Sequence, residues 1–258
     1  MLHYRHSGSN EQTSIVLLHA AGFDGRIWTR SAELLSGFNC ICPDLPGHGK
    51  SEGVPFTDFD DASDRVAELI ESLDPKPVHL AGLSLGSYVG FRLLVRHPHL
   101  VESAIFSGFQ HNPIPASVFI RAIMHASTWM MNSKRNREKM ARSMGVSDTK
   151  LISQASGRSN ASARTMRKIG SLALDFDASP ELSHVATRTL VVAGEKEHPA
   201  ILASLSAFQA AMPNCTSRLV PGLGHGWIAN DNELFAETLR AWTEQQTLPD
   251  RLAEITQG

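Results

Sequence analysis

The sequence predicts an α/β fold with a mostly parallel central sheet, helices on both faces of that sheet and a helical cap insertion. Short apolar runs alternate with segments of helical periodicity, which is typical of parallel strands joined by crossover helices. The length of 258 residues is enough for one large domain. A hydrophobic content of 42% and a charged content of 19% are ordinary for a globular protein.

The alternation is clear in the first hundred residues. Four short apolar runs predict strands at 15–19, 39–43, 78–82 and 103–107. The segments between them predict helices at 28–35, 59–73 and 85–95. The first run, Ile15 to Leu18, has no polar interruption, as expected for a strand that is buried on both faces.

The pattern changes over residues 109–185, where no continuous β-like run occurs. Helical-looking pieces at 118–131 and 135–144 precede a polar stretch, 153–165, which we expect to form a mobile lid edge. We interpret 109–185 as a helical cap inserted into a core made of 1–108 and 186–258. The alternation then resumes with strands at 189–193 and 216–220 and helices at 201–212 and 232–246.

Composition limits the classes of function. The net charge of −2 gives the molecule no general affinity for nucleic acid. No apolar run reaches the roughly 20 residues that span a bilayer, and the N-terminus lacks the apolar core of a signal peptide. Three cysteines are too few, and odd in number, for a disulfide framework. We therefore expect a cytoplasmic protein that acts on a small molecule. The sequence is compatible with a homodimer and does not decide the oligomeric state.

Ser84 is the most informative residue of the chain. It lies in Gly82-Leu83-Ser84-Leu85-Gly86, between a predicted strand and a predicted helix. Such a sharp turn holds its central residue in a strained conformation and needs small residues around it. The turn also lifts the hydroxyl clear of the sheet, beside the unpaired N–H groups of the helix N-terminus. This context predicts a nucleophile.

A serine nucleophile needs a general base, and the base needs an orienting acid. In open parallel sheets these groups follow the carboxyl ends of strands. His225, in a glycine-rich loop after the strand at 216–220, fits the base. Glu197 is our choice for the acid, with Glu195 and Asp231 as its rivals. The alternative role for Glu197 is to cap the helix that follows it.

Four segments, in this order along the chain, resemble motifs of the α/β-hydrolase fold superfamily. His19-Ala20-Ala21-Gly22-Phe23 resembles its H-G-x-G loop. The sequence DLPGHGKS at 44–51 resembles its D-x-P-G-x-G-x-S loop, and residues 82–86 resemble its nucleophile elbow. Residues 224–226 resemble the segment that holds the catalytic histidine. Two positions depart from the pattern, because Ala20 replaces a glycine and Glu197 stands where the family usually has Asp.

The resemblance implies a role for each matching residue. Ser84 is expected to be the nucleophile, His225 the base and then the acid, and Glu197 the orienting carboxylate. The main-chain N–H groups of Leu85 and Ala21 are expected to form the oxyanion hole. The apolar side chains that we expect in the substrate pocket are Phe23, Met124, Trp129 and Trp227.

We expect no metal and no other cofactor. No pair of His, Asp or Glu has the helical spacing of a metal site such as H-E-x-x-H, and no G-x-G-x-x-G is present. His19 and His48 invite a metal interpretation, but we expect them to hydrogen-bond the loops around the oxyanion hole.

The predicted cap carries a marked charge asymmetry. Between Lys134 and Lys168 there are ten Lys or Arg residues and only two acids, Glu138 and Asp148, which gives +8 in a chain of net −2. One interpretation is a solvated helix face. The other is a cap that attracts anionic substrates or an acidic surface.

The function that the sequence predicts first is hydrolysis of a carboxylic ester through an acyl-enzyme on Ser84. Relatives that release halide or open epoxides would carry Asp at this position. Alternatives on the same fold are C–C bond, thioester or lactone hydrolysis and hydroxynitrile cleavage. A rival of another class is a ligand receptor that keeps the triad but turns over slowly, and a third is a scaffold with a vestigial triad.

Overall fold

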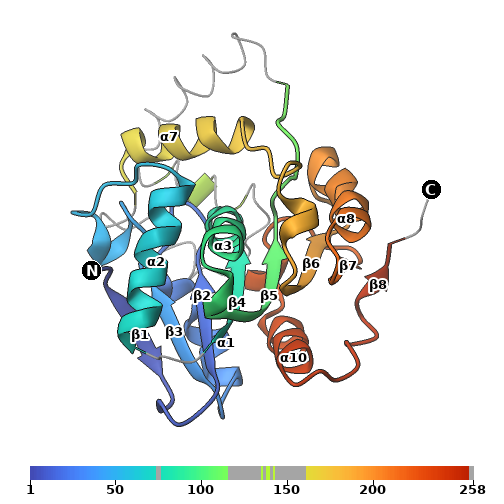
Figure 1. The fold of residues 1–258 in the computed structure, drawn as a ribbon, viewed down its shortest axis with the longest axis horizontal. Coiled ribbons are helices and arrows are strands. Elements are labelled where there is room, and N and C mark those ends of the chain that lie inside the picture. The colour runs from blue at the N-terminus through green and yellow to red at the C-terminus, as the bar shows by residue number, and fades with distance from the viewer. Residues whose placement is uncertain (74–76, 116–134, 136–137, 140–141, 143–160, 256–258) are drawn as a thin grey trace.

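The computed structural model describes residues 1–73, 77–115, 135, 138–139, 142 and 161–255. Eight strands in this part of the chain form one sheet, in the order β1-β3-β2-β4-β5-β6-β7-β8 (Figure 1). The strands are β1 (Tyr4–Ser7), β2 (Ser14–Leu18), β3 (Asn39–Pro43), β4 (Val78–Leu83), β5 (Val101–Ser107), β6 (Arg188–Gly194), β7 (Cys215–Val220) and β8 (Ala253–Glu254).

The sheet is parallel from β3 through β7, which confirms the predicted fold class. Only the outermost strands run the other way, β1 against β3 and β8 against β7. Every predicted strand is present, with its ends displaced by at most two residues. Strands β1 and β8 were not predicted from the sequence. The first is half exposed and polar, and the second has two residues, so neither has an apolar run.

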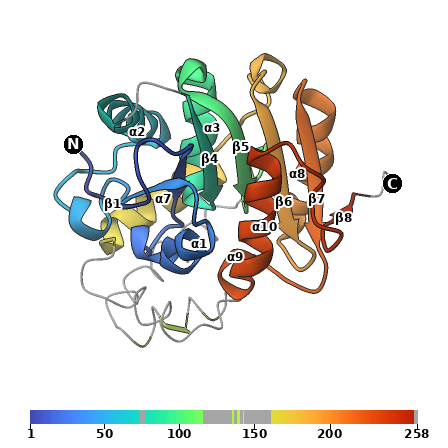
Figure 2. The ribbon, with the colours of Figure 1, turned by 90° about the horizontal axis from the view of Figure 1, so that it is seen from below.

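Helices cover both faces of the sheet (Figure 2). One face carries α2 (Phe59–Leu73), α3 (Leu85–Arg96) and α8 (Pro199–Ala211). The other carries α1 (Thr29–Leu34), α9 (Trp227–Asn230) and α10 (Asn232–Thr243). Short 3₁₀ turns are η1 (Gly25–Trp28), η2 (Gly49–Ser51), η3 (Pro98–Leu100) and η4 (Leu182–His184). Among the described residues, no helix is long and apolar enough to cross a membrane.

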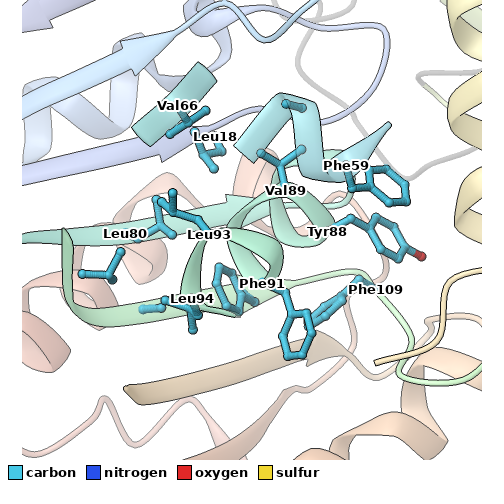
Figure 3. Packing of buried hydrophobic residues seen from close by; sticks show 14 of the residues in the cluster. Leu18, Phe59, Val66, Leu80, Tyr88, Val89, Phe91, Leu93, Leu94 and Phe109 are labelled. Carbon is cyan, nitrogen blue, oxygen red and sulfur yellow. The ribbon is translucent and has the colours of Figure 1, made fainter. Parts of the chain in front are cut away.

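Helix α3 lies at the centre of the core (Figure 3). Its residues Val89 and Phe91 are fully buried, and burial of such a side chain contributes roughly 1.5–3 kcal/mol. Tyr88 stacks on Phe59 of α2 with ring centroids 5.0 Å apart and meets the edge of Phe109 at 5.7 Å. The helix that follows Ser84 is therefore fixed by tight aromatic packing.

Part of the predicted cap is described. Helix α7 (Ala163–Leu174) and η4 lie in it, and no strand occurs in its described residues. Figure 1 shows α7 across the upper end of the molecule in that view, above α2 and α3. The helix predicted at 118–131, most of the one at 135–144 and most of the stretch 153–165 lie outside the described residues. Within that stretch, Ser162 caps α7 by accepting from the Thr165 amide at 3.1 Å. The division into core and cap stays a prediction.

A methyl group at Gly86 should destabilise the fold, because a Cβ there would lie 2.1 Å from the Leu18 carbonyl oxygen. We expect Gly86→Ala to lower the free energy of unfolding by at least about 2 kcal/mol, measured by urea denaturation. Gly53→Ala is the matched control, since a Cβ at Gly53 meets nothing within 4 Å. Equal stability of the two variants would contradict the predicted close packing.

Candidate active site

Ser84 occupies the turn between β4 and α3 in a conformation that side chains rarely adopt. Its φ is 53° and its ψ is −112°. The flanking glycines make this turn possible, because a Cβ at Gly82 would lie 2.5 Å from the Gly86 carbonyl oxygen. The strand-to-helix geometry predicted from the sequence is therefore present, with Ser84 at the N-terminus of α3.

The turn is anchored to the neighbouring strand β5. The Ser84 amide donates to the Ser107 carbonyl at 2.8 Å. The buried Ser87 hydroxyl lies 2.8 Å from the Gly82 carbonyl and 2.7 Å from the Ser107 carbonyl, and it accepts from the Ser107 amide at 3.0 Å. Leu85 is the first residue of α3, so its N–H has no carbonyl within the helix to bond to.

The loop after β2 supplies the second expected oxyanion donor. In the described part of the chain, the Ala21 amide donates to no acceptor, whereas the Gly22 amide donates to His48 Nε2 at 3.2 Å. His19 Nε2 accepts from the Leu45 amide at 2.9 Å. The two histidines thus connect this loop to the loop after β3, which is the role that we expected of them.

Both histidines are buried and neutral. Because their Nε2 atoms accept hydrogen bonds, their Nδ1–H groups donate, His19 to the Ala20 carbonyl at 2.9 Å and His48 to the Pro46 carbonyl at 3.0 Å. Burial lowers the pKa of His19, and burial with the adjacent His19 ring lowers the pKa of His48 to about 3. The loop after β2 is therefore supported by polar groups that carry no charge.

Asp44 organises the loop at 44–51 from a fully buried position. Its Oδ1 accepts from the Gly25 amide and its Oδ2 from the Lys50 amide, each at 2.8 Å. Gly49 has a φ of +52°, and a Cβ there would lie 2.4 Å from Asp44 Oδ2. The aspartate and the glycine of this motif are therefore required together.

His225 and Glu197 are in direct contact. His225 Nδ1 lies 3.0 Å from both carboxylate oxygens of Glu197, whose side chain is only 2% exposed. The imidazole extends across β6 to the end of β5, because a Cβ at Gly108 would lie 2.6 Å from His225 Cε1. Gly108 follows Ser107, which anchors Ser84. Ser84, His225 and Glu197 therefore all lie beyond the carboxyl ends of the central strands.

The rival acids have other partners. Glu195 accepts from the Gly222 amide at 2.7 Å. Asp231 caps α10 by accepting from the Leu234 amide at 2.9 Å and pairs with Arg251. The helix after Glu197 is capped instead by the adjacent histidine, His198.

Two of the four predicted pocket residues, Trp227 and Phe23, lie in the described part of the chain. Trp227 has no exposed surface and donates from Nε1 to the Ser107 hydroxyl at 2.8 Å. Phe23 is also buried, in the same core cluster. Both rings are packed in the core, and their place in a substrate pocket stays a prediction. Met124 and Trp129 lie outside the described residues. Among the described residues, no group of three or more His, Cys, Asp or Glu could hold a metal ion.

Comparison with known proteins is consistent with this architecture. Residues 15–238 match the sequence model of the alpha/beta hydrolase family. An AB hydrolase superfamily protein of Gibberella zeae is 28% identical over 253 residues, covering 92% of this chain and 82% of that protein. A pimeloyl-acyl-carrier-protein methyl ester esterase of Chromobacterium violaceum is 38% identical over 90 residues, 34% of each chain. An esterase structure from Exiguobacterium antarcticum is 19% identical, with a TM-score of 0.78 over 94% of this chain and 95% of that one.

The fold and its post-strand loops define an α/β hydrolase, and the match over residues 15–238 shows that the chain belongs to the alpha/beta hydrolase family. The resemblance found in the four sequence motifs is thereby confirmed. Hydrolases among its relatives support an enzyme of this family.

The lowered pKa of His48 should make stability depend on pH. The folded state keeps this ring neutral down to a pH of about 3, whereas its ordinary pKa is 6.5. Its contribution is therefore complete above pH 6.5 and is lost as the pH falls below that value. We expect His48→Gln to reduce the pH dependence of the unfolding free energy between pH 6 and 5 by up to about 1.4 kcal/mol per pH unit.

Urea denaturation at pH 7, 6 and 5 measures this slope. His99→Gln replaces an exposed histidine and serves as the control. An unchanged slope in His48→Gln would contradict a buried, neutral His48.

Proposed function

We propose that this protein is a serine hydrolase that cleaves carboxylic esters through a triad of Ser84, His225 and Glu197. The observation that carries the proposal is the contact of His225 Nδ1 with both Glu197 oxygens at 3.0 Å, in loops beside a strained Ser84. This contact leaves Nε2 as the ring atom available for the serine proton. The esterase relatives support the same class of reaction.

In the proposed mechanism, Ser84 Oγ attacks the ester carbonyl carbon while His225 Nε2 takes the hydroxyl proton. Glu197 orients the ring through Nδ1–H and stabilises the imidazolium. The N–H groups of Leu85 and Ala21 donate to the oxyanion, and each such donor is typically worth about 3 kcal/mol. The imidazolium then protonates the leaving alcohol. Water, activated by His225, releases the acid from the acyl-enzyme.

A glutamate in the acid position is compatible with this mechanism. Its side chain is one methylene longer than that of aspartate, and it starts from the turn after β6. The Glu197 amide donates to the Gly194 carbonyl at 3.1 Å. This bond fixes the main chain of the turn from which the Glu197 side chain extends. Because Glu197 is buried, water competes little for its bond to His225.

The triad substitutions test the proposal with p-nitrophenyl acetate and p-nitrophenyl butyrate. Ser84→Ala and His225→Ala should each lower kcat by at least about 10³-fold, because the two residues act as a unit. Glu197→Gln should lower kcat by about 10²- to 10⁴-fold, because the neutral amide no longer stabilises the imidazolium.

Glu195→Gln is the matched control, since it removes the same charge two residues away and its amide oxygen still accepts from Gly222. It should retain kcat within about threefold. Activity that survives Ser84→Ala would refute the nucleophile. A folded but inactive wild type that binds a ligand tightly would favour a receptor, and selective turnover of a diketone would favour C–C hydrolysis.

A further inference from the structure

The first turn of α7 lies against the two loops that follow β2 and β3. The Cβ position of Gly22 is 3.7 Å from Met166 Cε and 3.9 Å from Met166 Sδ. The Cβ position of Gly47 is 2.9 Å from Thr165 Cγ2. Met166 therefore covers the residue next to Ala21, the expected oxyanion donor.

Helix α7 is also fixed at its other end. The Tyr88 hydroxyl donates to Gln110 Oε1, and Gln110 Nε2 donates to the Ala173 carbonyl near the end of α7. The Tyr88 amide donates to the Ser84 carbonyl at 3.2 Å. Burial raises the pKa of Tyr88, so its hydroxyl keeps the proton that it donates. The position of α7, and of Met166 on it, is thus tied to the turn that carries Ser84.

The order of the strands indicates which part of an ester would meet Met166. Ser84 follows β4, while Gly108, Glu197 and His225 follow β5, β6 and β7 on one side of it. Because His225 must protonate the leaving alcohol, the alcohol group lies on that side. The acyl group then extends to the opposite side, where the loops after β2 and β3 carry Gly22 and Gly47.

We propose that Met166 is a specificity-determining residue that limits the length of the acyl chain; this inference rests on the proposed ester hydrolysis. Its half-buried thioether stands where the chain would pass beyond the oxyanion loop. A methionine forms an apolar wall that excludes bulk through contact rather than through charge. The structure thus favours esters of short, unbranched acids over esters of longer ones.

The test compares kcat/KM for p-nitrophenyl acetate and p-nitrophenyl hexanoate. Met166→Ala should raise the hexanoate-to-acetate ratio by about tenfold or more, since each methylene accommodated in an apolar pocket is worth about that factor. Met166→Phe should lower the ratio. Lys168→Ala is the matched control, because this exposed residue of the same helix should leave the ratio unchanged. An unchanged ratio in folded Met166→Ala overturns the inference.

A second measurement separates this inference from the proposed function. Calorimetry of acetate and hexanoate binding to Ser84→Ala measures the same subsite without turnover. Adding Met166→Ala to Ser84→Ala should shift the binding preference toward hexanoate. The inference is overturned if the double variant has the same preference as Ser84→Ala alone. Failure of the proposed function would give a different result. Either the wild type would not hydrolyse the esters, or hydrolysis would persist in Ser84→Ala.

Discussion

The close approach of main chains at the turn between β4 and α3 is the constraint on which the rest of the site depends. A side chain held in the conformation of Ser84 costs about 1–3 kcal/mol, so its surroundings must enforce it. They do so because Gly82 and Gly86 carry no side chains, which lets α3 begin directly against the Leu18 carbonyl. The buried residues of α3 then hold the helix, and with it the turn, in place.

Ser107 connects that turn to the loop that carries His225, the proposed base. Its main-chain atoms bond to Ser84 and Ser87, while its hydroxyl accepts from Trp227, two residues after His225. A displacement of β5 would therefore move both Ser84 and His225, the proposed nucleophile and base. This arrangement gives the buried Trp227 a supporting position behind the predicted site.

The six inner strands were predictable because they have local signals, and the turn at Ser84 has one as well. Strands buried on two faces are continuous apolar runs, and Ser84 lies in a motif of fixed spacing. The choice between Glu197 and Glu195 has no local signal. It depends on how the turn after β6 docks on a distant segment, where the Lys196 amide donates to the Leu223 carbonyl at 2.8 Å. Helix α7 was not predicted, although Met166, Ile169 and Ala173 recur at helical spacing after the capping Ser162.

The basic residues of α7 and its apolar residue Met166 act over different distances. On α7, the basic residues Arg164 and Lys168 are exposed and lie on the face opposite Met166 and Ile169, as the helical period requires. Exposed charges act over about 8 Å at physiological salt, so they influence how an anionic molecule approaches. Contact with Met166 acts only on a group already bound. We therefore expect the charge on this helix to affect the rate of encounter with an anionic molecule, and packing against Met166 to discriminate between acyl groups.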